Sequence, residues 1–285
     1  MPLLSVKNLR KEYPGFCLDN VSFSLEEGSI MGFIGRNGAG KTTTIKAMLN
    51  LIPRNGGEVL LDEVDFFANE NRCKQEVGLV MGAFDCYPTR TLGAIAAAAR
   101  PFYPNWDEAA YRGYLTAFSL EEGKKVKELS AGMQVKFALA LALSHGARLL
   151  ILDEPTSGLD PVSREELLDI FRRLMEEGDK SILFSTHVIS DLEKCADAIT
   201  YIQGGQILAS QDLISFREGH LLVAGEAAQL PQKLPYLLGY KQSAFGFTGL
   251  IARQEAPRFC DCRLAPADLE SIMLYREAKY EAPAI

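Results

Sequence analysis

The stretch that decides the fold is Gly35-Arg36-Asn37-Gly38-Ala39-Gly40-Lys41-Thr42, which Thr43 follows. A glycine, four residues, and then glycine, lysine and threonine form the pattern of a phosphate-binding loop. The glycines let the backbone wrap so that successive N–H groups point inward at an anion. We expect Lys41 to reach the β- and γ-phosphates of a nucleotide, and the Thr42 hydroxyl to bind Mg²⁺.

The segments on either side of this loop fit that prediction. The mostly apolar run Ser29–Ile34 is typical of a buried strand, and Thr42–Leu51 has helical character until Pro53 stops it. A helix that starts directly after the loop places partial positive charge where a phosphate would bind. A glycine-rich turn with an exposed lysine is the alternative, and the order strand, loop, helix argues against it.

Strand and helix patterns continue through most of the chain. The first 30 residues alternate apolar and polar side chains, which is typical of half-buried strands. Two apolar runs, Leu149–Leu152 and Ser181–Phe184, are typical of buried parallel strands, and Arg164–Glu177 between them has the pattern of an amphipathic helix. Good helix formers fill Ala94–Ala99 and Phe137–Leu143. Strands that alternate with helices predict an α/β fold with a mostly parallel core sheet.

Length and charge limit the possible functions. The chain has 285 residues, which at about 150 residues per domain predicts one large domain with an appendage. The net charge of −7 disfavours a nucleic-acid-binding protein, so no nucleic-acid partner is expected. Prolines and glycines break the chain after about Ser215, so we predict a main domain over residues 1–215 and a small α+β appendage over 216–285. A helix is predicted at the end of the appendage, over Pro266–Glu281.

Nothing in the sequence predicts a membrane-spanning or secreted chain. No apolar run approaches the roughly 18–20 residues that a membrane helix needs, and residues 1–5 do not begin a secretory signal. The six cysteines are scattered, as in proteins of a reducing compartment. We therefore expect a cytoplasmic chain that touches a membrane only through a partner.

A second motif supplies acidic groups. The apolar run Leu149–Leu152 ends in Asp153-Glu154, and a buried strand of this kind can deliver a carboxylate to a metal ion. Asp153 is predicted to hold Mg²⁺ with Thr42, directly or through water, and Glu154 to polarise the attacking water as a general base. Such a pair often only ends a strand at the surface, but downstream of a phosphate-binding loop it is a strong signal.

Four further motifs occur in the order and with the residues that are typical of one protein family. Leu129–Met133 resembles a signature sequence, Ser157–Asp160 a loop that runs between subunits, and Ser185–His187 the segment of a switch histidine. Tyr13 lies upstream, where that family stacks an aromatic ring on adenine. Over about residues 3–215 the chain thus resembles the nucleotide-binding subunit of ATP-binding cassette (ABC) proteins.

The resemblance implies a P-loop NTPase fold with an N-terminal antiparallel β subdomain and a helical signature subdomain at about residues 86–145. It also implies ATP and Mg²⁺ as ligands and a dimer, because the signature of one cassette faces the nucleotide of the other. The residues expected to contact ATP are Tyr13, Gly35, Asn37, Gly38, Ala39, Gly40, Lys41, Thr42, Thr43, Ser130, Gly132 and Asp160. Catalysis is expected from Glu154, His187 and Lys41. Metal binding is expected from Thr42 and Asp153.

Plainer roles stay open for three of these residues. Tyr13 could pack in the core instead of stacking on adenine. Asp160 could cap the helix that begins near Pro161, alone or in addition to an inter-subunit contact. His187 could be a surface histidine, although its Ser-Thr-His context favours a hydrogen bond to the γ-phosphate.

Two positions depart from the family pattern. Met133 stands where the signature often has glutamine, a variable position, so activity is expected to persist. Gly82 stands where a glutamine commonly touches the metal and its water and senses the membrane partner. Glycine can do neither through a side chain, so Asp85 or water would take that place. This departure affects the expected coupling between ATP hydrolysis and the membrane partner more than it affects nucleotide binding.

The predicted function is therefore that of the ATP-hydrolysing subunit of an ABC transporter, peripheral on the inner face of the membrane through a separate permease chain. A single cassette with a short tail most resembles bacterial exporters. Lys124, Lys125 and Lys127 either contact the partner or form a solvated face. A soluble cassette ATPase acting on ribosomes or DNA is the alternative, but such chains usually carry two cassettes or long coiled coils. A small-molecule kinase would leave Leu129–Met133 and His187 unexplained.

Overall fold

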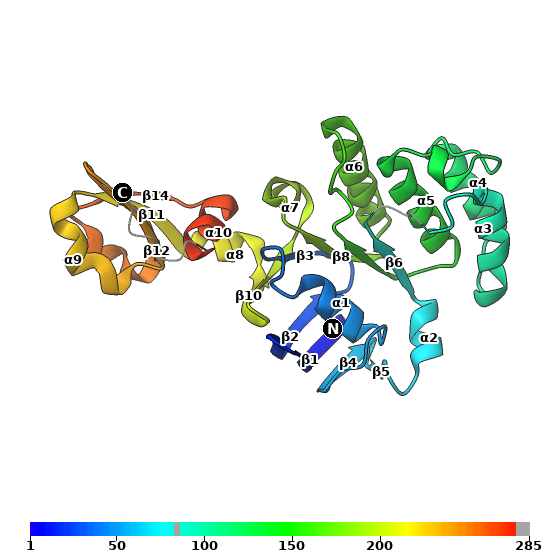
Figure 1. Ribbon diagram of the computed structural model, residues 1–285, viewed down its shortest axis with the longest axis horizontal. Coiled ribbons are helices and arrows are strands. Elements are labelled where there is room, and N and C mark those ends of the chain that lie inside the picture. Colours follow the sequence, from blue (N-terminus) through cyan, green and yellow to red (C-terminus); the bar gives the residue numbers. More distant parts are fainter. Residues whose placement is uncertain (83–85, 278–285) are drawn as a thin grey trace. The chain divides into compact units, whose positions relative to one another are not determined.

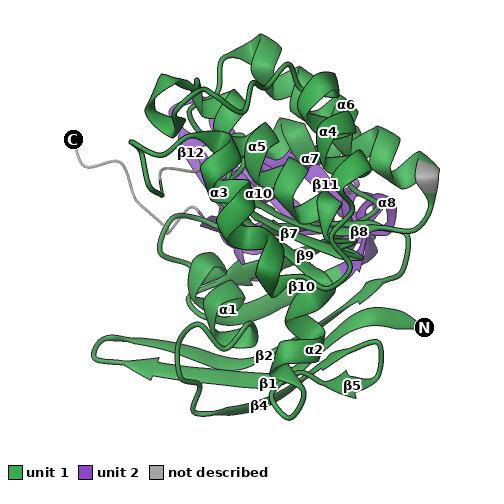
Figure 2. Cartoon of the chain, turned by 90° about the vertical axis from the view of Figure 1, so that its right-hand side faces the viewer, with its two compact units in different colours: residues 1–210 green, residues 211–285 purple. Residues whose placement is uncertain are grey.

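The computed structural model describes residues 1–82 and 86–277. The chain divides into two compact units, residues 1–210 and 211–285 (Figure 2). The sequence suggested a boundary after Ser215, but such a boundary would cut through helix α8 (Leu213–Glu218). This helix packs against strand β11 (His220–Gly225) and therefore belongs to the second unit.

The first unit contains an antiparallel sheet with the strand order β2-β1-β4-β5 (Figure 1). Its strands are β1 (Pro2–Tyr13), β2 (Phe16–Glu26), β4 (Gly56–Leu61) and β5 (Val64–Asp65). Alternating burial along β2 reflects its alternating sequence, because one face of the sheet packs on the core while the other meets solvent. The predicted antiparallel β subdomain at the N-terminus is confirmed.

The central sheet of the first unit has the order β10-β9-β3-β8-β7-β6, and the pairs from β9 to β6 are parallel. Its strands are β3 (Ile30–Ile34), β6 (Val77–Met81), β7 (Leu149–Asp153), β8 (Ser181–Thr186), β9 (Ala198–Gln203) and β10 (Gln206–Asp212). Every residue of β3, β7 and β8 is buried, as their continuous apolar sequences predict. The mostly parallel core sheet is confirmed.

Helices cover this sheet, and two clusters of buried apolar residues lie between the described elements. The helices of the first unit are α1 (Lys41–Met48), α2 (Glu70–Gln75), α3 (Leu92–Ala99), α4 (Glu108–Ala117), α5 (Ala131–Ser144), α6 (Pro161–Glu177) and α7 (Ile189–Cys195), with 3₁₀ turns η1 (Arg100–Phe102) and η2 (Val126–Glu128). One core joins α1 to both sheets, through residues such as Leu9, Ile45 and Ile151. The other lies among α3, α4 and α5, around Tyr111 and Phe137.

Two helix ends differ from the sequence-based expectation for local reasons. Helix α6 begins at Pro161 rather than Arg164, because the Asp160 side chain caps it and proline fits its first position. Helix α1 ends at Met48 rather than Leu51. None of the helices in the described parts of the chain is long and apolar enough to cross a bilayer.

The second unit is built on an antiparallel sheet with the order β12-β13-β11-β14. Its further elements are η3 (Ala227–Gln229), α9 (Leu230–Lys233), η4 (Leu234–Tyr236), β12 (Gly239–Ser243), β13 (Gly246–Ala252), η5 (Arg253–Phe259), β14 (Arg263–Pro266) and α10 (Leu269–Glu277). The final helix begins at Leu269 rather than Pro266, since Pro266 ends β14 and Asp268 accepts a hydrogen bond from Ser271 N at 2.7 Å. Residues 278–281 of the predicted helix lie outside the described residues.

Candidate active site

The phosphate-binding loop lies between β3 and α1, and two of its glycines are required by the backbone. Gly40 has a φ of +116°, and a Cβ there would lie 2.7 Å from Leu18 Cδ2. A Cβ on Gly35 would lie 2.3 Å from the main-chain oxygen of Ile202. Both distances are well below van der Waals contact, so the loop takes this path only with glycine at these positions.

The other loop residues differ in what they present to a ligand. Asn37 and Gly38 are exposed, and Thr43 is half-buried at the start of α1. Ala39 is buried, and its N–H donates to the main-chain oxygen of Arg36 at 3.0 Å. The N–H of Ala39 is thus engaged within the loop, so this residue shapes the loop in the structure.

Thr42 and Asp153 meet at the carboxyl end of the central sheet. The Thr42 hydroxyl donates to Asp153 Oδ2 at 2.7 Å, across 111 positions of sequence. The hydroxyl of Ser185, from the neighbouring strand β8, donates to Asp153 Oδ1 at 2.5 Å. Asp153 is 6% exposed, so both of its oxygens are held in fixed positions beside the phosphate-binding loop. Such a set of hydroxyl and carboxylate oxygens suits Mg²⁺.

Glu154 lies between a cation and an imidazole. Its Oε1 pairs with Lys41 Nζ at 3.2 Å, and its Oε2 lies 2.6 Å from His187 Nδ1. Lys41 is 6% exposed and also donates to Gly35 O at 2.7 Å, so its ammonium group folds back over the loop. The predicted base, lysine and histidine are therefore connected side chain to side chain.

The backbone at Glu154 is unusual. Its φ of +54° lies in the left-handed region, which costs a residue with a Cβ roughly 1–3 kcal/mol. The surrounding structure holds it there, because Glu154 N–H donates to Ser185 O at 2.9 Å. This turn aims the side chain away from the end of β7 and toward Lys41 and His187.

The signature residues form a second group with the start of α6. Ser130 caps α5, its hydroxyl accepting from Met133 N at 3.3 Å, and a Cβ on Gly132 would lie 3.2 Å from Ser163 Cβ. Asp160 caps α6 by accepting from the N–H groups of Val162 and Ser163 and from the Ser163 hydroxyl. The Ser163 hydroxyl contributes most to lowering the pKa of Asp160, which keeps this exposed carboxylate charged. The capping role considered for Asp160 is thus present.

Tyr13 and Gly82 are two further positions that the sequence singles out. The Tyr13 ring, at the end of β1, is 44% exposed, with Lys11 Nζ 4.7 Å from its centroid, so it is not a core residue. Gly82 has a φ of +58°, and its N–H donates to Asp153 O at 2.7 Å. Nothing lies within 4 Å of where its Cβ would be. Asp85, the suggested substitute for a glutamine, lies outside the described residues.

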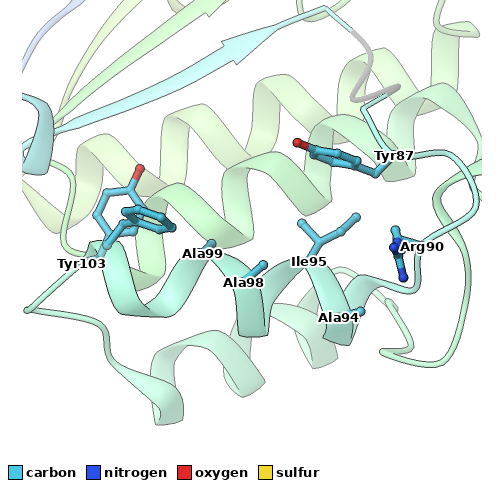
Figure 3. A pocket seen from close by; sticks show the side chains of 8 residues that line it. Tyr87, Arg90, Ala94, Ile95, Ala98, Ala99 and Tyr103 are labelled. Carbon is cyan, nitrogen blue, oxygen red and sulfur yellow. The ribbon is translucent and has the colours of Figure 1, made fainter.

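An apolar groove of about 690 Å³ follows helix α3. Ile95, Ala94, Ala98 and Ala99 form its floor, Tyr103 lies at one end, and Arg90 lies at the other beside Tyr87 (Figure 3). The Tyr87 ring is 69% exposed. No sequence motif marks this surface, since its residues are ordinary helix formers and aromatics spread over two turns.

Two further polar residues of the first unit have a place that no motif predicts. Ser185 orients Asp153, although the Ser-Thr-His motif that contains it points only to His187. Asp191, four residues after His187, is 1% exposed, and its Oδ2 lies 4.0 Å from Arg164 Nε. The neighbours of both residues in space are distant in the sequence. The only signal in the sequence is therefore a polar residue within an otherwise apolar or helical segment.

Comparison with known proteins agrees with this geometry. The sequence matches the model of the ABC transporter family over residues 18–157. The linearmycin resistance ATP-binding protein LnrL of Bacillus subtilis is 31% identical, over 73% of this chain and 68% of LnrL. The bacitracin transport ATP-binding protein BcrA of Bacillus licheniformis is 33% identical, over 67% of this chain and 63% of BcrA.

The fold is also similar to that of solved proteins. A structure of an ATP-binding subunit of an ABC transporter is 27% identical and superimposes with a TM-score of 0.67, over 75% of this chain and 92% of that chain. The family match contains the phosphate-binding loop, the signature and the Asp153-Glu154 pair. This chain therefore belongs to the family of ABC transporter ATP-binding proteins.

Proposed function

We propose that this chain hydrolyses Mg-ATP at the interface of a cassette dimer and couples hydrolysis to transport, in the direction of export, by a separate membrane permease. The chain would then lie on the inner face of the cell membrane, held there by the permease. The observation that carries the proposal is the continuous network from Lys41 through Glu154 to His187, beside the Thr42–Asp153 pair.

Glu154 has the contacts of a gated general base. In the resting site its two oxygens are occupied by Lys41 at 3.2 Å and by His187 at 2.6 Å. A bound triphosphate draws the Lys41 ammonium toward its own oxygens, which releases Oε1 for the attacking water. His187 keeps its contact with Oε2, so the carboxylate stays oriented while it accepts the proton. The base is then available only when nucleotide is present.

The oxygen donors beside the loop fit Mg²⁺. Thr42 and Asp153 would hold the ion, and Ser185 keeps the carboxylate in place through its other oxygen. When bound, the ion neutralises charge on the phosphates. Gly82 adds no side chain, so water would complete the coordination on that side.

The second residue group supports a dimer. Ser130 is exposed at the N-terminus of α5, a helix of 14 residues, and Gly132 is buried where a Cβ would lie 3.2 Å from Ser163 Cβ. Such a helix end suits phosphate oxygens. Since this group belongs with α5 and α6 rather than with the Lys41 network, we propose that it completes the nucleotide site of a second cassette, either another copy of this chain or a related one.

The α3 groove is the surface that we propose for the permease. Its floor is apolar, its aromatic rim is exposed and Arg90 adds one positive charge, so an amphipathic helix of a cytoplasmic loop that carries an acidic residue would fit it. Strand β6 ends beside the site, where Gly82 N–H donates to Asp153 O at 2.7 Å, and the groove residue Tyr87 follows Gly82 by five positions in the sequence.

Export is proposed from the relatives. LnrL is a linearmycin resistance protein and BcrA a bacitracin transport protein. Outward movement is the direction in which a transporter confers resistance to a compound. The same proposal assigns the choice of cargo to the permease, because the sites proposed above for the first unit bind nucleotide or a partner.

The test is isolation of the complex. We would express tagged Glu154→Gln protein in its native cell, solubilise the membranes in mild detergent with ATP, and identify co-purifying chains by mass spectrometry. A multi-helix membrane protein in near-equal amount is expected, and the groove variant Ile95→Asp should lose it while still binding ATP. Recovery from the soluble fraction only, alone or with ribosomes or DNA, would contradict the proposal.

A further inference from the structure

The second unit contains a cavity that the proposed function does not use. Its volume is about 220 Å³, and its walls come from α8, the start of β11, the residue that follows β13 and the end of β14. These segments meet because β11 runs antiparallel to both β13 and β14, so its first residues lie beside their last ones. The whole unit lies outside the family match, which covers residues 18–157.

The polar part of the lining is mostly positive. Arg217 and Arg253 line the cavity, and Glu218 is the acidic residue among the described residues of the lining. The chain as a whole carries a net charge of −7, so two guanidinium groups at one small cavity differ from the average surface. A guanidinium presents paired N–H donors that match the two oxygens of a carboxylate. The cavity therefore favours an anion.

Arg253 is held in place by the end of α8. Its main-chain N–H donates to Gly219 O at 2.8 Å, and its Nε donates to Glu218 O. Its two Nη groups have no hydrogen-bond or ion-pair partner among the residues that the structure describes. A guanidinium that is already ordered loses little freedom when a ligand binds, and this favours binding.

His220 forms a neutral part of the wall. It is 7% exposed, its Nε2 lies 3.1 Å from Arg276 Nη2, and its Nδ1 lies 2.7 Å from Phe216 O. Arginine can only donate, so Nε2 is the acceptor and Nδ1 carries the proton that is donated to the carbonyl. Both ring nitrogens are thus engaged with the protein, and the positive charge at the cavity comes from the arginines.

The rest of the lining is apolar and consists of Ile214, Pro266 and Ala267. Sites for drug-sized ligands occupy about 300–1,000 Å³, so this smaller cavity suits a ligand with a few carbons. We propose that it binds a small organic carboxylate, whose oxygens are held by Arg217 and Arg253 and whose short alkyl chain lies against the apolar wall. An inorganic anion would leave that wall unused. The proposal does not depend on ATP hydrolysis.

The test is a titration of the full chain with hexanoate, followed by NMR. The chain has three histidines, so the ring resonances of His220 can be assigned by comparison with His220→Gln. We expect these resonances to shift with hexanoate until the site is saturated. Arg253→Gln should raise the Kd about tenfold or more, because a charged hydrogen bond is lost. Arg263→Gln makes the same charge change on β14, outside the lining, and should keep the Kd within about twofold.

Two further ligands test the chemical class. Acetate has the same carboxylate but no alkyl chain, so its Kd should be about tenfold or more above that of hexanoate, since buried methylene groups contribute to binding. Inorganic phosphate should also bind more weakly than hexanoate, because it cannot use the apolar wall. Acetate or phosphate that binds as tightly as hexanoate would overturn the assignment of an organic carboxylate.

A second variant covers the case in which Arg253→Gln does not fold. Ile214 is 66% exposed, so Ile214→Glu should fold, and it places a further negative charge at the cavity. Its Kd for hexanoate should rise about tenfold or more, because like charges repel. The inference is overturned if hexanoate leaves the His220 resonances of the wild-type chain unmoved. It is also overturned if Arg253→Gln or Ile214→Glu, once folded, binds hexanoate as Arg263→Gln does.

Discussion

Replacing Glu154 by glutamine keeps the shape of the side chain and removes its negative charge. The hydrogen-bonding position next to His187 Nδ1 is retained, but the side chain can no longer accept a proton from water. Loss of a general base lowers turnover by about 10²–10⁴-fold, which corresponds to about 3–5 kcal/mol of activation free energy. We expect a loss of this size in single-turnover hydrolysis, measured as phosphate release.

The same change should tighten nucleotide binding. In the resting site Glu154 pairs with Lys41 at 3.2 Å, with exposed fractions of 23% and 6% for the two side chains. A triphosphate competes with this partly exposed pair, whose contribution is about 1 kcal/mol. Its removal should therefore lower the Kd for ATP by about fivefold, as measured by the fluorescence of a labelled ATP analogue.

The matched control is Glu58→Gln. Glu58 pairs with Lys7 at 3.3 Å on the antiparallel sheet, and both side chains are about half exposed. The chemical change is identical, so this variant should retain wild-type turnover and affinity. Turnover of Glu154→Gln within about threefold of wild type would refute the assignment of the base. Weaker ATP binding in Glu154→Gln would refute the gating by Lys41.

Three further outcomes can be checked with the purified chain. Lys41→Ala should weaken ATP binding by about 10–100-fold, because a charged hydrogen bond to the phosphates is lost, and an unchanged Kd would count against the phosphate-binding loop. Arg148→Met should lower the free energy of unfolding in urea by about 1–3 kcal/mol, because Arg148 is 34% exposed and several partly screened ion pairs are lost together. Its partners are Glu27 at 2.8 Å, Asp62 at 3.0 Å and Glu76 at 3.1 Å. Burial lowers the pKa of His220, so the unfolded chain binds a proton more readily than the folded one below pH 6.5. The second unit should therefore lose stability as the pH falls through that value, and His220→Gln should show a smaller loss in thermal melts at pH 5.5 and 7.5.

The chemistry of the site could be predicted from the sequence where it is encoded by neighbouring residues. Eight consecutive residues, Gly35–Thr42, fix the phosphate-binding loop because its function is carried by the backbone path and one lysine. The pair Asp153-Glu154 could be found because a fully apolar strand precedes it. The central sheet followed from the same runs, since strands buried on both faces contain few polar residues.

The rest depends on contacts between distant segments. The role of Ser185 becomes visible only when β8 pairs with β7 and brings its hydroxyl to Asp153. Asp191 has the sequence context of a surface helix, and its burial follows from the packing of α7 on α6. Asp160 and Pro161 begin α6, but the apolar periodicity predicts a helix only from Arg164, because the first turn of α6 contributes few apolar contacts to the core.

The left-handed backbone of Glu154 has a consequence for how this protein can change under selection. Glycine adopts such a φ without strain, but Glu154→Gly would also leave the Lys41 ammonium, which is 6% exposed, without its carboxylate partner. A residue with a Cβ in this backbone conformation is thus kept by what its side chain does rather than by any preference of its main chain.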